Sequence, residues 1–176
     1  EALPRSIPIL TNFLKANLLN PWQIIIADNA STDRTRSVSE ALCREHPRVS
    51  YLYLPQKGRG RALRSAWLDS TADIVSYMDV DLSTDLAHFP QLVQALESGH
   101  HIAIGSRLSR GAHVTRSLKR TLISLSYNLL IKGLFFTALV DTQCGFKALT
   151  RQTAQAIVPS IKNNNWFFDT ELLIIA

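Results

Sequence analysis

The sequence contains only two cysteines, Cys43 and Cys144, and no CxxC pair. This scarcity excludes a disulfide framework and a cysteine-based zinc site, and it predicts reduced thiols in a cytoplasmic setting. The first residues show no signal-peptide pattern, so we do not expect secretion. With 176 residues, 46% of them hydrophobic, the chain can bury one core that needs no disulfide or structural metal.

Signatures of several enzyme classes are also missing. The chain has neither a Walker phosphate-binding loop nor the Gly-x-Ser-x-Gly motif of a hydrolase. Its histidines lack metal-ligand spacing; they are His46, His88, His100, His101 and His113. These absences disfavour a P-loop protein, a serine hydrolase and a histidine-held metal centre.

Acidic residues are absent from residue 98 to residue 140, although the chain as a whole has 14 Asp and Glu against 19 Lys and Arg. The cations in this segment are Arg107, Arg110, Arg116, Lys119, Arg120 and Lys132. Their placement predicts a local field that attracts anions. Aromatic residues are not interleaved with these charges as a nucleic-acid platform requires, so we expect no nucleic-acid partner.

The stretch from residue 121 to residue 140 is apolar on nearly all sides, but Lys132 interrupts it. A transmembrane helix needs about 20 apolar residues in succession. The stretch therefore favours one or two interfacial or core helices.

Short apolar runs alternate with amphipathic segments along the chain. Strands are predicted at residues 21–28, 49–54, 73–79 and 101–105, and helices at about 33–46, 62–70, 85–98 and near the C-terminal end. This alternation predicts an α/β fold with a mostly parallel central sheet and helices on both faces. We expect one domain over residues 1–176, truncated at both ends, because Glu1 is not a natural start and the chain stops within a helical pattern.

Ligands bind at the carboxyl ends of strands in such sheets, and polar segments follow three of the predicted strands at residues 28–31, 79–81 and 105–107. Asp79 and Asp81 together can face a divalent cation, Mg²⁺ or Mn²⁺, which prefers oxygen ligands shared with water and phosphate. The alternative is a capped turn before the helix at Asp85.

Two further segments have the chemistry of a nucleotide site. Asp28 and Asn29 can hydrogen-bond a base or ribose, although a helix N-cap also explains the residues that follow them. Lys57, Gly58 and Arg59 combine cations with flexible backbone at a helix start, which suits a diphosphate.

Taken together, these segments resemble family 2 glycosyltransferases of the GT-A nucleotide-sugar-binding fold. The sequence Asp-Asn-Ala-Ser-Thr-Asp-Arg-Thr at 28–35 is similar to the family's Asp-Asp-Gly-Ser-Thr-Asp-Gly-Thr. The sequence Lys-Gly-Arg-Gly-Arg-Ala at 57–62 is similar to the family's Arg-Gly-Lys-Gly-Ala-Ala. Asp-Val-Asp at 79–81 is similar to the family's metal-binding Asp-x-Asp. The family's opening strand, ending in Pro-x-Tyr-Asn-Glu, is absent, and Asn29 stands where an Asp is common.

Within this family, the later motifs are similar to those of polyprenyl-phosphate hexose synthases. Asp-Thr-Gln-Cys-Gly-Phe-Lys at 141–147 and Trp-Phe-Phe-Asp-Thr-Glu-Leu-Leu at 166–173 look most like the dolichyl-phosphate glucosyltransferase branch. The mannosyl branch more often has Ser/Thr-Gly-Phe-Arg at the first of these places. Glucose is therefore favoured over mannose.

The resemblance implies inverting transfer of a hexose from a UDP- or GDP-sugar to a polyprenyl phosphate at the cytoplasmic face of a membrane, with the protein peripheral or anchored by segments outside this chain. The implied catalytic residues are Asp79, Asp81 and Arg107, with the metal on Asp79 and Asp81. The implied nucleotide-sugar contacts are Asp28, Asn29, Lys57, Gly58, Arg59 and Asp79, and the implied acceptor-phosphate contacts are Arg107, Arg116, Lys119 and Arg120.

Other functions remain open on the sequence alone. A hydroxyl acceptor on a glycan would need a general base, and Gln143, Asp169 and Glu171 are the candidates for base or sugar contacts. A sugar-nucleotide nucleotidyltransferase would share the fold and the paired carboxylates, but it normally shows a glycine-rich N-terminal signature. A non-catalytic binding domain would tolerate loss of Asp79 or Asp81, and both are present.

Overall fold

The computed structural model describes residues 2–105, 133 and 144–176. Its helices are α1 (Leu3–Asn17), α2 (Thr35–Glu45), α3 (Arg59–Leu68), α4 (Phe89–Glu97), α6 (Arg151–Ile157) and α7 (Phe168–Ile175), with short 3₁₀ turns η1 (Leu86–His88) and η2 (Val158–Ser160). Its strands are β1 (Ile24–Asn29), β2 (Val49–Leu54), β3 (Ile74–Met78), β4 (Ile102–Ile104) and β5 (Phe146–Thr150).

The strands form two small sheets. β1 and β2 pair in parallel, from Ile24 opposite Val49 to Asn29 opposite Leu54. In the second sheet β5 lies between β3 and β4 and is antiparallel to both, so β3 and β4 point in the same direction. The α/β class is as predicted, whereas the mostly parallel sheet is found only in part. The difference arises because residues 146–150 form an antiparallel strand between β3 and β4.

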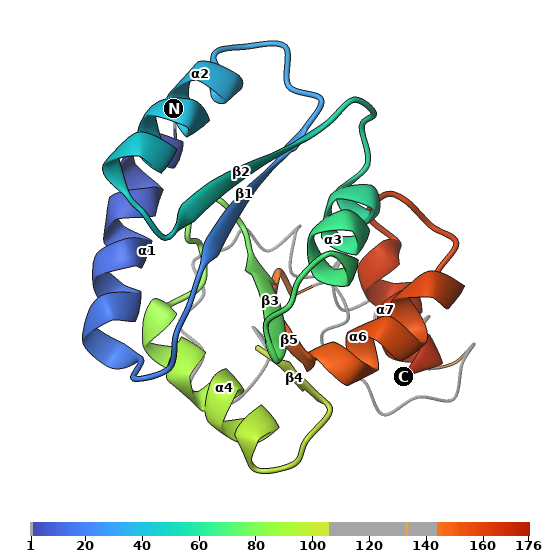
Figure 1. Cartoon of the computed structure of the whole chain (residues 1–176). Coiled ribbons are helices and arrows are strands. Elements are labelled where there is room, and N and C mark those ends of the chain that lie inside the picture. The colour runs from blue at the N-terminus through green and yellow to red at the C-terminus, as the bar shows by residue number, and fades with distance from the viewer. Residues whose placement is uncertain (1, 106–132, 134–143) are drawn as a thin grey trace.

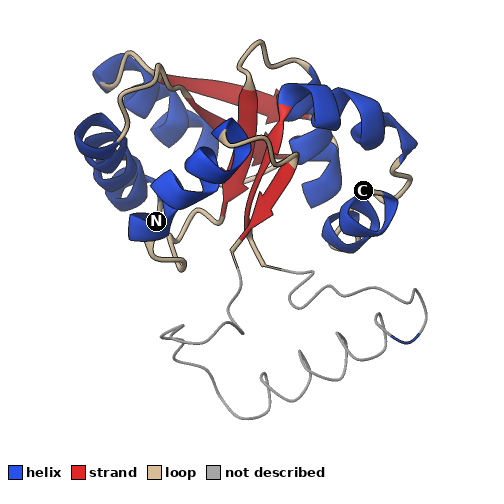
Figure 2. Ribbon diagram, turned by 90° about the horizontal axis from the view of Figure 1, so that it is seen from below, coloured by secondary structure: helices blue, strands red, loops and turns tan. Residues whose placement is uncertain are grey.

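Helices cover the strands from both sides. α1, α2 and α4 lie on one side and α3, α6 and α7 on the other (Figure 1), and the strands run between the two groups when the molecule is seen from below (Figure 2). Each side has its own apolar core: Leu10, Ile26 and Phe146 belong to one, and Trp67 and Phe168 to the other. The prediction of helices on both faces agrees with this arrangement.

Some element boundaries differ from the sequence prediction. The single helix expected at 85–98 is divided into η1 and α4, because Asp85 caps η1 through its Oδ1 and Pro90 lies in the first turn of α4. The helix expected from residue 62 begins three residues earlier, at Arg59, after Gly58 with its φ of 144°. Helix α1 and strand β5 were not predicted.

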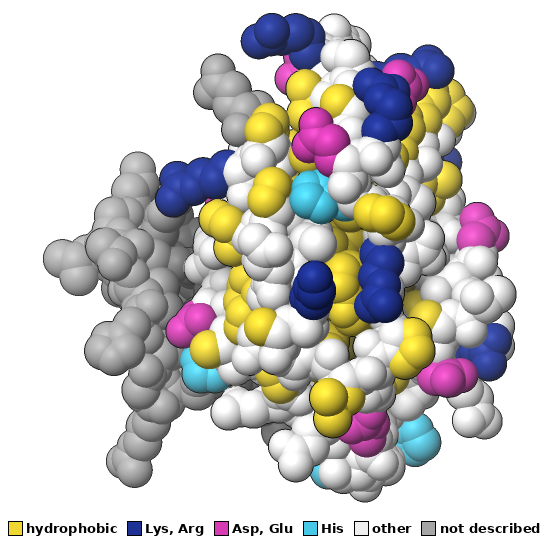
Figure 3. Space-filling view, turned by 60° about the vertical axis from the view of Figure 1, so that its left-hand side comes forward, with side chains coloured by type: hydrophobic (Ala, Val, Ile, Leu, Met, Phe, Trp, Pro, Cys, Tyr) yellow, Lys and Arg dark blue, Asp and Glu magenta, His cyan; other side chains and the backbone are white. Residues whose placement is uncertain are grey.

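Surface chemistry on the described part of the chain is mixed. The face shown in Figure 3 carries apolar, cationic and acidic side chains side by side, with no single patch of one charge. The basic segment predicted to attract anions lies outside the described residues from residue 106 onward, as do the interfacial helices expected at 121–140. None of the helices among the described residues has the length and hydropathy that crossing a bilayer requires.

A close helix–helix contact fixes the position of α3 against α7. A Cβ on Gly60 would lie 2.7 Å from both Cβ and Cδ2 of Phe168. Phe168 is fully buried, and its Cβ cannot swing away from its own backbone. Only glycine fits at this crossing, and the contact places the start of α3 beside the start of α7.

We expect Gly60→Ala to lower the free energy of unfolding by about 1–3 kcal/mol, because the added methyl overpacks the α3–α7 contact. Urea unfolding of the two proteins measures the difference. Ser65→Ala, in the same helix but only partly buried, is the control and should change stability by less than about 0.5 kcal/mol. An unchanged unfolding midpoint for Gly60→Ala would contradict the close contact.

Candidate functional site

Charged side chains from four elements meet where β3 ends. Arg59 comes from the first turn of α3, Asp79 follows β3, Lys147 lies in β5 and Asp169 in the first turn of α7. The register of the second sheet places Tyr77 directly opposite Lys147. The site therefore depends on both the β3–β5 pairing and the packing of α3 against α7.

Arg59 bridges two carboxylates. Its Nη2 lies 3.2 Å from Asp79 Oδ1 and its Nε 3.5 Å from Asp169 Oδ2. The guanidinium is 5.0 Å from the centre of the Tyr77 ring and 4.6 Å from that of Trp166, both within cation–π range. Burial lowers the pKa of Arg59, but Tyr77 and the two carboxylates outweigh it and raise that pKa.

Lys147 and Asp169 form a buried ion pair. Lys147 Nζ donates to Asp169 Oδ1 at 2.9 Å, to the Cys144 carbonyl at 2.7 Å and to the Tyr77 hydroxyl at 3.3 Å. The Tyr77 hydroxyl also donates to Asp169. Burial lowers the pKa of Lys147 while Asp169 opposes that change, and burial together with Asp169 raises the pKa of Tyr77. Asp169, a predicted candidate base, thus accepts hydrogen bonds from Lys147 and Tyr77 and forms an ion pair with Arg59.

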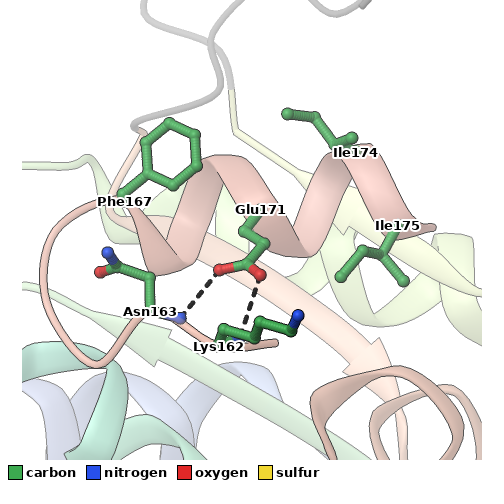
Figure 4. A pocket seen from close by; sticks show the side chains of 6 residues that line it. All are labelled: Lys162, Asn163, Phe167, Glu171, Ile174 and Ile175. Atoms are coloured by element: carbon green, nitrogen blue, oxygen red, sulfur yellow. Dashed lines mark hydrogen bonds between the residues drawn. The ribbon is translucent and has the colours of Figure 1, made fainter. Parts of the chain in front are cut away.

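Glu171, the other predicted base, holds a loop. Its carboxylate accepts the backbone N–H groups of Lys162 and Asn163, each at 2.9 Å (Figure 4). The same loop turns back to the start of α3, where Arg61 N donates to the Asn164 carbonyl at 3.2 Å. The pocket in Figure 4 is lined by Lys162, Asn163, Phe167, Glu171, Ile174 and Ile175. Glu171 therefore supports the backbone of the loop that lies against the start of α3.

The two aspartates of the Asp-x-Asp segment differ in setting. Asp79 is 43% exposed at its side chain, and a Cβ on Gly145 would overlap its Oδ2 and lie 2.8 Å from its Cγ. Asp81 is exposed, and its Oδ1 accepts the Ser83 N–H at 3.0 Å. The predicted alternative, a capped turn before the helix at Asp85, is found in part, because Asp81 caps this turn through the Ser83 N–H while Asp85 caps η1.

The chemistry of this donor set fits a hard cation. Asp79 and Asp81 offer carboxylate oxygens close to solvent, and no larger cluster of His, Cys, Asp and Glu exists within the described ranges. A magnesium or manganese ion with two protein carboxylates takes its other ligands from water and substrate phosphate. The set therefore suits a metal that is shared with a phosphate-bearing ligand.

Asp28 stabilises the end of β1. It is 3% exposed; Oδ1 accepts the Ser31 N–H at 2.9 Å and Oδ2 the Tyr51 hydroxyl at 2.7 Å. Burial raises the pKa of Asp28, but the hydrogen bonds from Ser31 and Tyr51 outweigh it and lower that pKa. Helix α2 has a different cap, because Asp33 accepts the Thr35 N–H. The buried Oδ1 of neighbouring Asn29 has no hydrogen-bond partner among the described residues.

The glycine-rich segment before α3 is held against the loop after η2. Gly58 has a φ of 144°, and a Cβ there would lie 2.5 Å from the Asn164 carbonyl oxygen. Lys57, next to it, is exposed. The segment thus presents Lys57 to solvent and directs Arg59 inward to the carboxylates.

Several predicted residues lie outside the described residues, namely Arg107, Arg116, Lys119, Arg120 and Gln143. Conversely, Tyr77, Gly145 and Lys147 were not predicted as site residues, and Trp166 was given no chemical role. The sequence did contain one sign of the role of Lys147. This residue is the one charge within the otherwise apolar run Cys-Gly-Phe-Lys-Ala-Leu at 144–149. A charged residue in a buried strand needs an opposite charge beside it.

Replacing Tyr51 with Phe should lower the free energy of unfolding by about 1 kcal/mol at neutral pH, because Asp28 loses one of its donors. The folded-state pKa of Asp28 lies below its ordinary value, so the contribution of its charge is complete above that ordinary value and disappears as the pH falls through the folded pKa. The difference between the two proteins should therefore shrink in acid, as urea unfolding at about pH 7 and about pH 3 will show.

Tyr53→Phe is the matched control for this experiment, since Tyr53 is in the same strand but 47% exposed. It should have no effect at either pH. A difference between wild type and Tyr51→Phe that stays constant in acid would show that the hydroxyl acts independently of the Asp28 charge.

Comparisons with known proteins place the chain in a family. The family model described as glycosyl transferase family 2 matches residues 5–157. Glycosyltransferase AglD of Haloferax volcanii is 34% identical over 173 residues, covering 97% of this chain and 27% of that protein. The dolichyl-phosphate beta-glucosyltransferases of Homo sapiens and Saccharomyces cerevisiae are 32% and 27% identical, covering 88% and 94% of this chain.

The chain spans about half the length of these two glucosyltransferases, 51% and 55%. Among solved structures, glucosyl-3-phosphoglycerate synthase from Mycobacterium tuberculosis in complex with UDP superposes with a TM-score of 0.68 at 18% identity, covering 98% of this chain and 60% of that one. This likeness shows a shared fold. The match of the family model over residues 5–157 establishes that the chain belongs to glycosyl transferase family 2.

Proposed function

We propose that the protein transfers a hexose, with glucose favoured over mannose, from a UDP- or GDP-sugar to a polyprenyl phosphate at the cytoplasmic face of a membrane. The names of the dolichyl-phosphate glucosyltransferase relatives support this acceptor. In the proposed step a phosphate oxygen of the acceptor forms a bond to the anomeric carbon. The bond from that carbon to the nucleoside diphosphate breaks, and the configuration inverts.

The observation that carries the proposal is that both candidate bases already have partners within the protein. Asp169 is buried in an ion pair with Lys147, and Glu171 accepts two backbone N–H groups. A hydroxyl acceptor needs a carboxylate free to take a proton. A phosphate monoester has a second pKa of about 6 and is already ionised near neutral pH. A site whose described carboxylates are engaged in this way suits a phosphate acceptor.

Donor binding is assigned to the residues around β1, α3 and β3. The Asn29 amide, whose Oδ1 has no hydrogen-bond partner among the described residues, suits the base or ribose, and Asp28 keeps the turn that carries it. Lys57 and Arg59 suit the diphosphate, and Gly58 between them lets the chain pass close to the Asn164 carbonyl. Asp79 and Asp81 would hold the Mg²⁺ or Mn²⁺ ion, which supplies positive charge to the departing diphosphate. Acceptor binding is assigned to Arg107, Arg116, Lys119 and Arg120, with the membrane surface beside them.

The test is transfer from labelled UDP- and GDP-hexoses to a short polyprenyl phosphate by the full-length protein, with and without EDTA. We expect a lipid product with one donor, and its loss by about two orders of magnitude in EDTA or in Asp81→Asn. Asp69→Asn, an exposed carboxylate at the other end of α3, is the control and should leave transfer unchanged.

A different result would favour another acceptor. If glycan or other hydroxyl acceptors are glycosylated and the lipid phosphate is not, the polyprenyl assignment is wrong. Asp169 and Glu171 would then have to leave their present partners to act as base. Exchange of pyrophosphate into the sugar nucleotide would instead indicate a nucleotidyltransferase.

Gly145→Ala should reduce transfer by about tenfold or more while changing the free energy of unfolding by less than about 1 kcal/mol. The new methyl overlaps the Asp79 carboxylate, which is the end of a side chain and can rotate away from its position. Steady-state transfer and urea unfolding are measured on the same preparation.

Gly99→Ala provides the opposite pattern as a control. Gly99 has a φ of 97° and open space around it, so alanine there should cost about 1 kcal/mol of stability through backbone strain and leave transfer unchanged. Full transfer by Gly145→Ala would show that the position of Asp79 is not critical.

A further inference from the structure

We infer that Arg59 is an internal counter-cation for Asp79 that a divalent metal must displace, so that the free protein binds the metal weakly and the nucleoside diphosphate strengthens metal binding by drawing Arg59 away. This inference rests on the metal site of the proposed function. It concerns the order and coupling of binding, which that proposal leaves open.

The two oxygens of Asp79 face different neighbours. Oδ2 lies against the backbone of Gly145, where a Cβ would overlap it, and Oδ1 is covered by Arg59 Nη2 at 3.2 Å. The oxygen that the guanidinium covers is thus Oδ1. A metal ion that takes Asp79 as a ligand competes with Arg59 for this oxygen.

Arg59 is also anchored where it can remain after releasing Asp79. Nε stays within 3.5 Å of Asp169 Oδ2, and the rings of Tyr77 and Trp166 lie against the guanidinium. By contrast, Nη2 is buried but makes no well-aligned hydrogen bond, even though Asp79 Oδ1 is near. The contact with Asp79 is therefore a charge contact without a well-aligned hydrogen bond, and a rotation of the guanidinium can break it while the contacts with Asp169 and the two rings remain.

Charge balance explains why the diphosphate is needed. Among the described residues, Arg59 and Lys147 offset Asp79 and Asp169 one for one, and exposed Asp81 adds one further negative charge to the proposed metal site. A divalent cation on Asp79 adds two positive charges beside a guanidinium whose side chain is only 17% exposed. The metal ion and the guanidinium repel each other until an anion lies close to both of them. A diphosphate carries enough negative charge, and is long enough, to contact the metal ion and Arg59 together.

The test measures Mn²⁺ binding to the full-length protein without nucleotide, from the electron paramagnetic resonance signal of free Mn²⁺. We expect Arg59→Gln to bind Mn²⁺ about fivefold more tightly than wild type, because the competing charge is gone. The same variant should bind UDP more weakly at saturating Mn²⁺. These opposite changes distinguish lost competition from a damaged fold, which would weaken both.

Two further variants serve as controls. Arg36→Gln removes a guanidinium from another carboxylate pair, with Glu40 at 2.9 Å in α2, and should leave Mn²⁺ affinity unchanged. Arg59→Lys keeps the positive charge and should stay close to wild type. If Arg59→Gln binds Mn²⁺ no more tightly than wild type, or if neither protein binds Mn²⁺, the inference is wrong.

The two proposals can fail separately. Tighter Mn²⁺ binding by Arg59→Gln together with no transfer to polyprenyl phosphate would support the counter-cation and refute the acceptor. Normal lipid transfer by the wild-type protein together with unchanged Mn²⁺ affinity in Arg59→Gln would support the acceptor and refute the counter-cation.

Discussion

The buried ion pair between Lys147 and Asp169 is the interaction on which the rest of the site depends. Both side chains are almost fully buried, and each would leave an uncompensated charge in the interior if the other were removed. The pair joins β5 to α7, and the remaining oxygen of Asp169 faces Arg59. The contact between β5 and α7 therefore also fixes the carboxylate that holds the Arg59 guanidinium in place.

The placement of this pair follows from sheet register and from one glycine. Pairing of β3 with β5 sets Tyr77 across from Lys147, so the tyrosine hydroxyl reaches the same carboxylate as the lysine. Gly60 lets α7 approach α3 closely enough for Asp169 to meet Arg59. Backbone geometry in three elements therefore converges on a single carboxylate, and an error in any of them would separate the charges.

Much of this fold could be predicted from local patterns, because short β-branched runs between polar turns identify strands such as β1 and β2. β5 could not, since Gly-Phe-Lys contains a charge that a buried strand ordinarily avoids, and its partners are distant in sequence. Asp169 was a candidate base on sequence alone because its partner is also distant in sequence. Its actual partner, Lys147, is 22 residues away, and only the packing of α7 on β5 shows that the carboxylate is neutralised. Contacts of Asp79 with Gly145 were equally invisible.

The charge arrangement has a consequence for the chemistry. The described carboxylates that could serve as bases are engaged by the protein's own cations and N–H groups, so the site does not hold a strong base ready for a neutral acceptor. In the reaction that we propose, negative charge arrives with the substrates. A diphosphate on the donor and an ionised phosphate on the acceptor would both provide it, and both suit the cation-rich segment that follows β4. The charge balance around Arg59 and Asp79 therefore supports the proposal of two phosphate-bearing substrates over that of a neutral acceptor.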